Sequence, residues 1–405
     1  MDDWVCLELV TIESPTGHFH MPILVHKKLL WKFGLNPRQT PAERSASSEQ
    51  TLWVLTDGRA GHESQSKGIV AALSSTRHVQ VHWVSATLRS PLWRWMLRTA
   101  ARLLPPGFLY RLLPISYHLS PWPDSEPDIV ISSGGDTLFM LGALSARHNA
   151  PSVFSGTTKR YPRKFLDCVF TVVPDPAKHN VVLPLPPVAI SDLNRPKVTT
   201  PERLLTGCVL IGGDGAGCVF VDSDWQRLAK GMAGLGNDVR WLLRTSRRTE
   251  GKHETELKSM LHGNTVALER SVWWADNPER VMDEFLHDCD FIVCTQDSLS
   301  MLAEAMYTGK PVYSFAPKHC QMTENDAAAI AGYIEQGFLK TIEDAQQIAI
   351  EHEPNPRSEN IYAQIDRAIG AAQERRERAN TDPKSWGKKL QRLIEAVPQS
   401  IGLEK

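Results

Sequence analysis

The feature that most constrains the fold is a repeated alternation between short apolar runs and longer helix-like runs, which begins at residue 51. Residues 51–56 form an apolar run, 64–73 have helical character, and 79–84 alternate with a period of two. Strands that alternate with helices favour a parallel sheet covered on both faces. The alternation starts again after a proline-rich stretch at 184–204. We therefore predict an α/β protein with two doubly wound, Rossmann-like domains.

The same pattern sets the expected domain boundaries. Residues 1–50 have no clear periodicity, so we expect an N-terminal extension that is partly disordered. We predict the first domain at 51–190 and the second at 200–350, joined by the proline-rich linker. A charged tail with helical character follows at 355–405. Doubly wound sheets bind ligands at the carboxyl ends of their strands, so we expect the functional residues there, in a cleft between the domains.

Composition excludes several classes of protein. The 405 residues are 42% hydrophobic and 22% charged, with a formal net charge of −1. These values are typical of a globular protein and give no global field for nucleic acid. The sequence has neither an apolar run long enough for a membrane span nor a signal peptide. Its seven cysteines are scattered without a CxxC pair, so we predict reduced thiols, a cytoplasmic protein and no zinc.

Four predicted strands end in turns that suit a phosphate, at 56–65, 132–137, 212–217 and 295–305. Glycines in such turns let backbone N–H groups approach an anion, and the N-terminus of a following helix adds partial positive charge. A tight turn that binds nothing is the alternative for each one taken alone. None completes a dinucleotide fingerprint or a Walker A motif, which disfavours nicotinamide binding and ATP hydrolysis.

The second predicted domain carries the candidate nucleotide-binding residues. Three arginines lie in the loop at 244–248, and guanidinium groups bind phosphate bidentately, although a solvated basic loop is the alternative. A helix begins near Asp297, and a carboxylate about two turns into it suits the hydroxyls of a ribose. The candidates are Gly213, Gly215, Gly217, Arg244, Ser246, Arg247, Arg248, Asp297, Ser298 and Glu304.

The segment 295–315 resembles the donor-nucleotide helix of GT-B glycosyltransferases, in which a glutamate holds the ribose ahead of a G-x-P turn. Here Glu304 and the turn that starts at Gly309 fit that pattern. Gln321 and Asn325 have the spacing of the donor-sugar amides in the lipid II-forming N-acetylglucosaminyltransferase. The resemblance implies that both side chains contact the sugar of a nucleotide-sugar donor.

The turns at 60–65 and 132–137 resemble the two glycine turns of that same enzyme. Together with the segments 245–249 and 295–305, they resemble more closely the bacterial branch of the mitochondrial-fission "elongated mitochondria" family, over roughly 51–345. Bacterial members are proposed glycosyltransferases, some of them tied to the lipooligosaccharide outer core. The plant branch is known for organelle fission. The resemblance therefore implies the GT-B fold and leaves the activity open between these two roles.

The resemblance to GT-B enzymes implies a reaction without a bound metal or another cofactor. Backbone N–H groups, a helix N-terminus and arginines would stabilise the leaving phosphate. No metal-binding triad is evident, and no D-x-D motif lies at a strand end, since the D-S-D at 222–224 starts a predicted helix. His62, which the plant pattern lacks, is the expected general base, with a hydrogen bond to the donor diphosphate as its alternative role. Asp57 and Asp136 are the competing carboxylates. The expected acceptor-side residues are Gly58, Gly61, Gly134 and Gly135.

Residues 87–122 combine five arginines with six aromatic residues and contain no acid. Two prolines after Leu104 predict two short helices. Basic side chains next to interfacial aromatics suit an anionic membrane surface, while a core helix with a lid is the alternative. The expected partners are thus a nucleotide-sugar donor, a glycolipid or lipid-linked acceptor and an anionic membrane, without nucleic acid.

Three functions fit these observations. The first is transfer of a sugar from a nucleotide-sugar to a lipid-linked or lipopolysaccharide-type acceptor, at the cytoplasmic face of the inner membrane. The second is a non-catalytic, membrane-associated adaptor of the mitochondrial-fission type that keeps the fold. The third is a nucleotide-sugar epimerase. The joint presence of His62, the three arginines and Glu304 favours the first.

Overall fold

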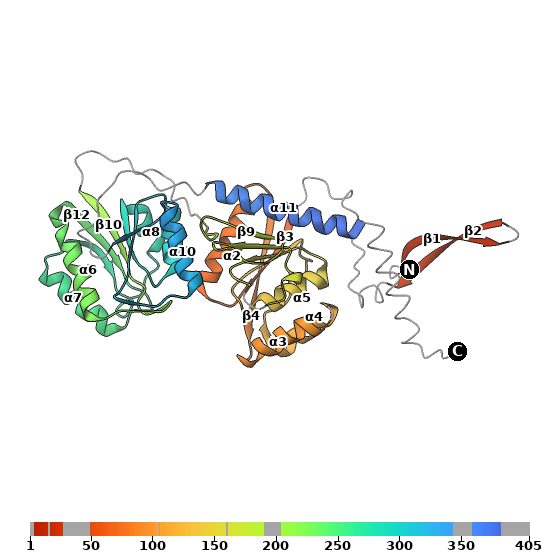
Figure 1. The fold of residues 1–405 in the computed structure, drawn as a ribbon, viewed down its shortest axis with the longest axis horizontal. Coiled ribbons are helices and arrows are strands. Elements are labelled where there is room, and N and C mark those ends of the chain that lie inside the picture. Colours follow the sequence, from red (N-terminus) through yellow and green to blue (C-terminus); the bar gives the residue numbers. More distant parts are fainter. Residues whose placement is uncertain are drawn as a thin grey trace. The chain divides into compact units, whose positions relative to one another are not determined.

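The computed structural model describes residues 4–14, 17–26, 49–104, 106–158, 161–189, 204–342 and 359–381. The chain divides into unit 1, which comprises Met1–Val181 and Gln364–Lys405, and unit 2, which comprises Val182–Ala363. Each unit has its own sheet with helices packed against it (Figure 1). The predicted fold class, two doubly wound Rossmann-like α/β units, is confirmed.

Unit 1 is built on a seven-stranded sheet in the order β5-β4-β3-β6-β7-β8-β9. The neighbouring strands from β4 through β8 are parallel, and β5 is antiparallel to β4 at the edge. The strands are β3 (Gln50–Thr56), β4 (Val79–Leu88), β5 (Tyr117–Leu119), β6 (Ile129–Ser133), β7 (Ser152–Ser155), β8 (Cys168–Thr171) and β9 (Asn180–Val182). The helices are α2 (Ala60–Ser74), α3 (Leu92–Leu103), α4 (Pro106–Ser116), α5 (Leu138–His148), the 3-10 helix η2 (Arg163–Phe165) and α11 (Glu359–Thr381).

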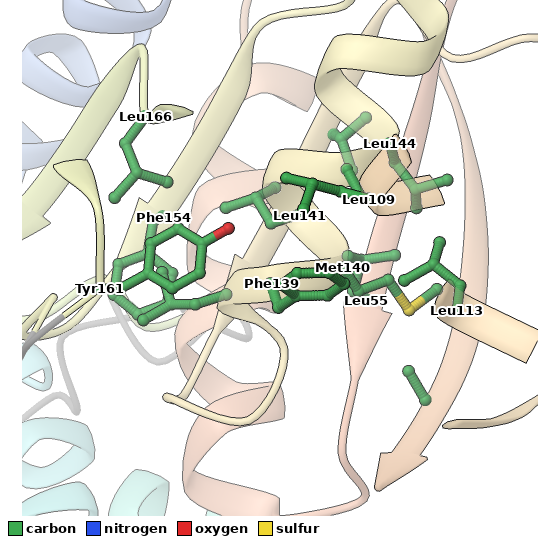
Figure 2. Packing of buried hydrophobic residues seen from close by; sticks show 14 of the residues in the cluster. Leu55, Leu109, Leu113, Phe139, Met140, Leu141, Leu144, Phe154, Tyr161 and Leu166 are labelled. Carbon is green, nitrogen blue, oxygen red and sulfur yellow. The ribbon is translucent and has the colours of Figure 1, made fainter. Parts of the chain in front are cut away.

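Apolar residues at consecutive positions of β3 explain why both faces of this sheet are covered. Trp53 and Leu55 join a buried cluster with side chains of α4 and α5, part of which Figure 2 shows. Leu52 and Val54 are equally buried, and successive side chains of a strand point to opposite faces. The strand therefore has an apolar surface on each side, as a parallel sheet between two helical layers requires.

The tail helix α11 packs against unit 1 from Gln364 onward and does not form a separate element. Ile365 and Ile369 are fully buried. Arg77, just after α2, pairs with Asp366 at 2.6 Å and donates to Gln373 at 2.7 Å. The helical prediction for the tail holds over the described part of α11, and residues 382–405 lie outside the described residues.

The N-terminal region contains two strands where the sequence predicted only an extension. β1 (Trp4–Ser14) and β2 (Gly17–His26) form an antiparallel hairpin. The sequence missed it because these segments lack the period-two alternation that marks a strand with one buried face. Residues 27–48, and most of the predicted linker, lie outside the described residues.

Unit 2 has a six-stranded parallel sheet in the order β13-β12-β10-β14-β15-β17. Counted along the chain, this is the 3-2-1-4-5-6 order of dinucleotide-binding folds. Helices α6 and α7 lie on one face and α8 and α10 on the other (Figure 1). The strands are β10 (Leu205–Leu210), β12 (Val239–Arg244), β13 (Leu268–Val272), β14 (Phe291–Thr295), β15 (Val312–Phe315) and β17 (Lys340–Ile342). The other elements are β11 (Cys218–Val219), α6 (Asp222–Gly234), η3 (Gly236–Asp238), α7 (Gly251–Gly263), α8 (Met282–Asp288), α9 (Leu299–Tyr307), β16 (His319–Cys320) and α10 (Glu324–Glu335).

The strand orders locate the candidate sites. In an open parallel sheet, a ligand binds where the order reverses, between the first strand and a strand from the other half. This switch point lies between β3 and β6 in unit 1 and between β10 and β14 in unit 2. Within the described part of the chain, no helix has the length and hydropathy of a membrane span.

Candidate functional site

The first two predicted glycine turns meet at the switch point of unit 1. Leu55 of β3 pairs with Ser132 of β6, so the loops that follow the two strands emerge side by side. Gly58 donates its N–H to Thr56 Oγ1 at 3.0 Å, and Gly61 lies in the first turn of α2. The same turn of α2 carries His62, which is thereby placed over the end of β6.

His62 is held by a carboxylate and by a glycine. Its Nδ1 lies 2.9 Å from Asp57 Oδ2 and 3.0 Å from Oδ1. A Cβ atom added to Gly134 would lie 2.2 Å from the same Nδ1, and Gly134 has a φ of +89°. Only glycine leaves room for the imidazole at this point and adopts this backbone conformation without strain. The two glycine turns therefore form one structure around His62.

The Asp57–His62 pair has the geometry of a general base and its orienting carboxylate. Burial would raise the pKa of Asp57, but the hydrogen bond and the charge of His62, together with Arg59, bring that pKa below its usual value. The carboxylate is 5% exposed and the imidazole 28% exposed. An ionised Asp57 accepts a hydrogen bond from the Nδ1–H group of His62. Nε2 is then the unprotonated nitrogen and can take up a proton, as in hydrolase triads.

Asp136 is engaged in a different ion pair. Both its carboxylate oxygens accept hydrogen bonds from Arg94 of α3, at 2.6 and 2.8 Å. Its main-chain oxygen accepts a hydrogen bond from Tyr117 at 2.6 Å. These contacts orient Asp136 toward α3, and they make Arg94 part of the site's frame instead of a free cation of the 87–122 stretch. Sequence reasoning missed this pair because the partners are 42 residues apart.

Glu63 also has a positioning contact that the sequence did not reveal. It was expected only as an acid in the first turn of its helix. In the structure its Oε1 accepts a hydrogen bond from Thr56 at 2.8 Å, while Thr56 Oγ1 accepts the N–H of Gly58. The last residue of β3 therefore ties the glycine turn to α2.

Replacing Gly134 with alanine is expected to destabilise the protein by about 3 kcal/mol, because the new methyl group overlaps the His62 ring and the left-handed backbone disfavours alanine. Chemical denaturation measures the change. Gly135→Ala is the matched control, since a Cβ there meets nothing within 4 Å, and its effect should stay within about 0.5 kcal/mol. Equal stability of the two variants would show that His62 is not held against Gly134.

In unit 2, the loops after three strands converge at the switch point. Gly212, which follows β10, donates its N–H to Thr295 at the end of β14, at 2.8 Å. The Gly212 carbonyl accepts hydrogen bonds from Ser246 Oγ and from Thr249 Oγ1, the latter at 3.2 Å. The loop 246–249 after β12 is thus fixed against the other two. Thr295 and Thr249 were missed because a lone threonine in a loop carries no motif.

A buried ion pair lies beneath the glycine turn. Arg248 Nη2 donates to Asp297 Oδ2 at 2.6 Å, with the carboxylate fully buried and the guanidinium 35% exposed. A Cβ on Gly215 would lie 1.8 Å from Arg248 Nη1, so this glycine is needed for the arginine to fit. Burial raises the pKa of Asp297 to about 6, although a hydrogen bond from Thr295 and the charge of Arg248 act against that rise. Asp297 Oδ1 has no hydrogen-bond partner among the described residues.

The glycine turn at 212–217 is also joined to its neighbours through the backbone. Gly213 bridges to Arg248, and the Gly217 carbonyl accepts the N–H of Gln321 at 2.7 Å. The N–H of Gly215 donates within the turn, to the Cys218 carbonyl at 3.1 Å. That N–H therefore already has a partner within the turn.

The other predicted donor-binding residues of unit 2 differ in their burial and in their contacts. Burial lowers the pKa of Arg244, which ends β12, while the charge of Glu304 raises it, so these two side chains interact. Ser298 is the buried N-cap position of α9, but its side chain makes no capping hydrogen bond. Arg247 and Asn325 are exposed, the latter in the first turn of α10. The structure therefore places the Arg248–Asp297 ion pair at this sheet edge, brings the charges of Arg244 and Glu304 near enough to affect each other, and leaves Arg247 exposed.

The loop after β10 carries a disulfide that contradicts the predicted reduced state of two cysteines. Cys218 of β11 and Cys320 of β16 are directly opposite in a two-stranded antiparallel sheet and are bonded to each other. Their separation of 102 residues hides this proximity in the sequence. Cys168, Cys208, Cys289 and Cys294 are buried and form no disulfide. The disulfide links the glycine turn to the segment that begins at Gln321.

The fold and these two sites define a protein with two Rossmann-like units, one presenting an oriented histidine and the other an arginine-containing loop cluster. Residues 60–326, more than half of the chain, match the family model described as Mitochondrial fission ELM1. The chain belongs to this family, as the sequence motifs predicted. No protein of curated function matches the sequence.

Several solved structures are similar to the chain at low identity. MurG of Acinetobacter baumannii is 11% identical, with 82% of this chain and 94% of that chain covered and a TM-score of 0.44. A UDP-glucosyltransferase from Polygonum tinctorium is 10% identical, with coverage of 87% and 99% and a TM-score of 0.45. A putative UDP-N-acetylglucosamine 2-epimerase from Listeria monocytogenes is 12% identical, with coverage of 88% and 98% and a TM-score of 0.44.

Proposed function

We propose that the protein is a glycosyltransferase that needs no metal for the transfer step and moves a sugar from a nucleotide-sugar donor to a lipid-linked or lipopolysaccharide-type acceptor at the cytoplasmic face of a membrane. The observation that carries the proposal is the cluster at the unit 2 switch point. There the glycine turn 212–217 and the Arg248–Asp297 pair stand at the carboxyl edge of a sheet with the nucleotide-binding strand order, and the charges of Arg244 and Glu304 affect each other.

Each part of this cluster suits one part of a nucleotide-sugar. Arg248 offers a partly exposed guanidinium to a diphosphate, and the charge of the leaving group grows as the sugar bond breaks, so a fixed cation stabilises the transition state more than the ground state. Glu304 is the expected partner of the ribose hydroxyls. Gln321 and Asn325 are the expected partners of the sugar. Asp297 Oδ1, which has no hydrogen-bond partner among the described residues, would accept a hydrogen bond from the nucleotide-sugar.

Unit 1 supplies the acceptor chemistry in this proposal. His62 Nε2 removes the proton of the acceptor hydroxyl while that oxygen attacks the anomeric carbon, and the nucleoside diphosphate leaves with the electron pair of the broken bond. Asp57 stabilises the imidazolium that forms, since it already accepts a hydrogen bond from Nδ1. Gly134 keeps the space next to the ring free of a side chain.

A surface on α3 and α4 supports the membrane part of the proposal. We call it the α3–α4 apolar surface: it consists of the exposed side chains Leu92, Trp95, Met96, Leu103, Leu104, Phe108 and Ile115. In α3 these positions follow helical spacing, and Arg98 and Arg102, four residues apart, share a helix face, while Arg94 is paired with Asp136. An apolar stripe flanked by arginines matches an anionic lipid surface. A membrane-bound acceptor would be presented to unit 1 from such a surface.

The same surface fits the alternative of a non-catalytic adaptor, so the donor site decides between the two functions. A thermal-shift screen against UDP-, CMP-, GDP- and ADP-sugars is expected to find at least one that raises the melting temperature. Glu304→Ala should abolish that shift, because it removes the proposed ribose contact. Glu335→Ala, an exposed glutamate at the end of α10, is the control and should keep the shift. If no nucleotide-sugar stabilises the wild type, the enzyme proposal fails and the adaptor remains.

Flotation with liposomes tests the membrane surface. The wild type is expected to float with vesicles that contain anionic lipid and to float less with neutral ones. Leu92→Glu combined with Trp95→Glu should reduce binding by at least roughly tenfold, since a large apolar side chain contributes about 1.5–3 kcal/mol when fully buried. Ile334→Glu, at an exposed apolar position of α10, is the matched control. Equal flotation of the double variant and the wild type would rule out this surface as the lipid contact.

A further inference from the structure

The first turns of α6 and α7 bring together three side chains that neither site uses. Asp222 is the first residue of α6, and His253 and Glu256 lie three residues apart on α7. One potential ligand atom from each lies within 4.8 Å of the other two. The residues three apart share a helix face, which is how a histidine and a carboxylate on one helix meet at a metal ion.

Two atoms of this cluster are buried without a hydrogen bond. His253 Nδ1 and Glu256 Oε2 have no hydrogen-bond partner among the described residues, although they lie 3.5 Å apart. The imidazole is 11% exposed and packs 5.8 Å from the ring of buried Trp225. A buried polar atom left without a partner costs about 1–3 kcal/mol, so such groups in native proteins ordinarily bind water or an ion. Both atoms are thus available to one ligand.

The charges of the side chains at this cluster favour a bound cation. The cluster holds two carboxylates, those of Asp222 and Glu256, beside a single imidazole. Neighbouring Lys252 is 3.1 Å from Glu250 and projects into solvent. Lys252 is thus paired outside the cluster, and within the cluster Glu256 has His253 as its ion-pair partner at 3.5 Å.

We propose that Asp222, His253 and Glu256 bind a divalent transition-metal ion, with zinc as the expected occupant. One imidazole and two carboxylates are ligands that zinc accepts, and three protein ligands leave a position for water. Hard ions such as magnesium and calcium prefer oxygen ligands alone, so the histidine selects against them. The sequence suggested no metal because Asp222 and the α7 pair are far apart in the chain and match no zinc spacing.

The position of the site assigns the ion a structural role. It would join the start of α6 to the start of α7, and the turns 212–217 and 246–249 lie just before these helices in the chain. A cation there fixes the two turns without touching the reacting atoms. The inference does not rest on the proposed transfer reaction, because it concerns binding of a metal and can be tested without a substrate.

The test is titration of the untagged, chelator-treated full chain with zinc chloride in a calorimeter. We expect one ion per chain. His253→Gln and Glu256→Gln should each weaken binding by at least about tenfold, given that even the loss of an outer-shell contact weakens a metal site by about 10–100-fold. His262→Gln, an exposed histidine at the other end of α7, is the matched control and should bind zinc as the wild type does.

Cobalt(II) chloride added to the wild type keeps the proposal falsifiable if a variant fails to fold. Cobalt held by oxygen and nitrogen gives visible d–d bands without the charge-transfer band of a cobalt–thiolate bond. The proposal is overturned if the wild type binds no zinc, if a thiolate band shows that cysteines hold the ion, or if His253→Gln and His262→Gln weaken binding equally. If the wild type binds no zinc, His253 and Glu256 form an ion pair and not a metal site.

Discussion

Replacing His62 with glutamine is expected to lower the turnover number of sugar transfer by about 10²–10⁴-fold while nucleotide-sugar binding stays unchanged. Glutamine keeps a polar side chain of similar size next to Asp57 but cannot take up the acceptor proton. The proposed donor contacts lie in unit 2, so the thermal shift caused by the nucleotide-sugar should persist. Release of nucleoside diphosphate, measured with the nucleotide-sugar that stabilises the protein, gives the turnover number.

Asp57→Asn separates the role of the base from that of its orienting carboxylate. The amide cannot stabilise an imidazolium on Nδ1, so we expect a lower turnover number with an unchanged Michaelis constant for the donor. Glu63→Gln is a suitable control, because an amide oxygen can still accept the hydrogen bond from Thr56. Unchanged turnover in His62→Gln would remove His62 as the base. A raised Michaelis constant with normal turnover would instead indicate its alternative role as a diphosphate contact.

The fold could be predicted because its signals are local and repeated. Strands β3, β6 and β14 are short apolar runs, and each is followed by a turn and a helix, α2, α5 and α9. A glycine with a positive φ, Gly309, follows the end of α9. A parallel sheet needs this alternation, so the pattern and the fold imply each other. The hairpin near the N-terminus was missed because its two strands form a separate two-stranded sheet, outside the strand–helix alternation from which the fold was predicted.

The sequence predicted which loops carry the candidate sites, but it did not predict the side-chain contacts within them. Glycine-rich turns at strand ends can be read from the sequence, and topology then places them at the switch points. The contacts between side chains depend on strand register and on packing between residues that are far apart in the sequence. Examples are Arg94 with Asp136, Arg248 with Asp297, and Cys218 with Cys320. Arg247 and Arg248 are equivalent in the sequence, and only the packing of Arg248 under Gly215 distinguishes them.

Arg248→Ala is expected to destabilise the protein in a pH-dependent way. The folded-state pKa of Asp297, about 6, lies above the ordinary value of 3.8 for this carboxyl. Between these values the folded state binds more protons than the unfolded state, so stability falls as the pH rises from about 4 to about 6. Removing Arg248 takes away the charge that opposes this rise in pKa. The pKa of Asp297 then increases further, and the loss of stability continues to higher pH.

At pH 8 the variant should therefore lose roughly 2–3 kcal/mol, less than the 3–5 kcal/mol of a fully buried pair because Arg248 is 35% exposed. At pH 5, where Asp297 is mostly protonated in both proteins, the loss should be much smaller. Urea unfolding at the two pH values measures both. Asp297→Asn added to Arg248→Ala should recover most of the loss at pH 8, since no buried charge remains. Arg247→Ala is the matched control and should stay within about 0.5 kcal/mol of the wild type. A loss in Arg248→Ala that is equal at both pH values would show that the side chain acts through packing and not through the charge of Asp297.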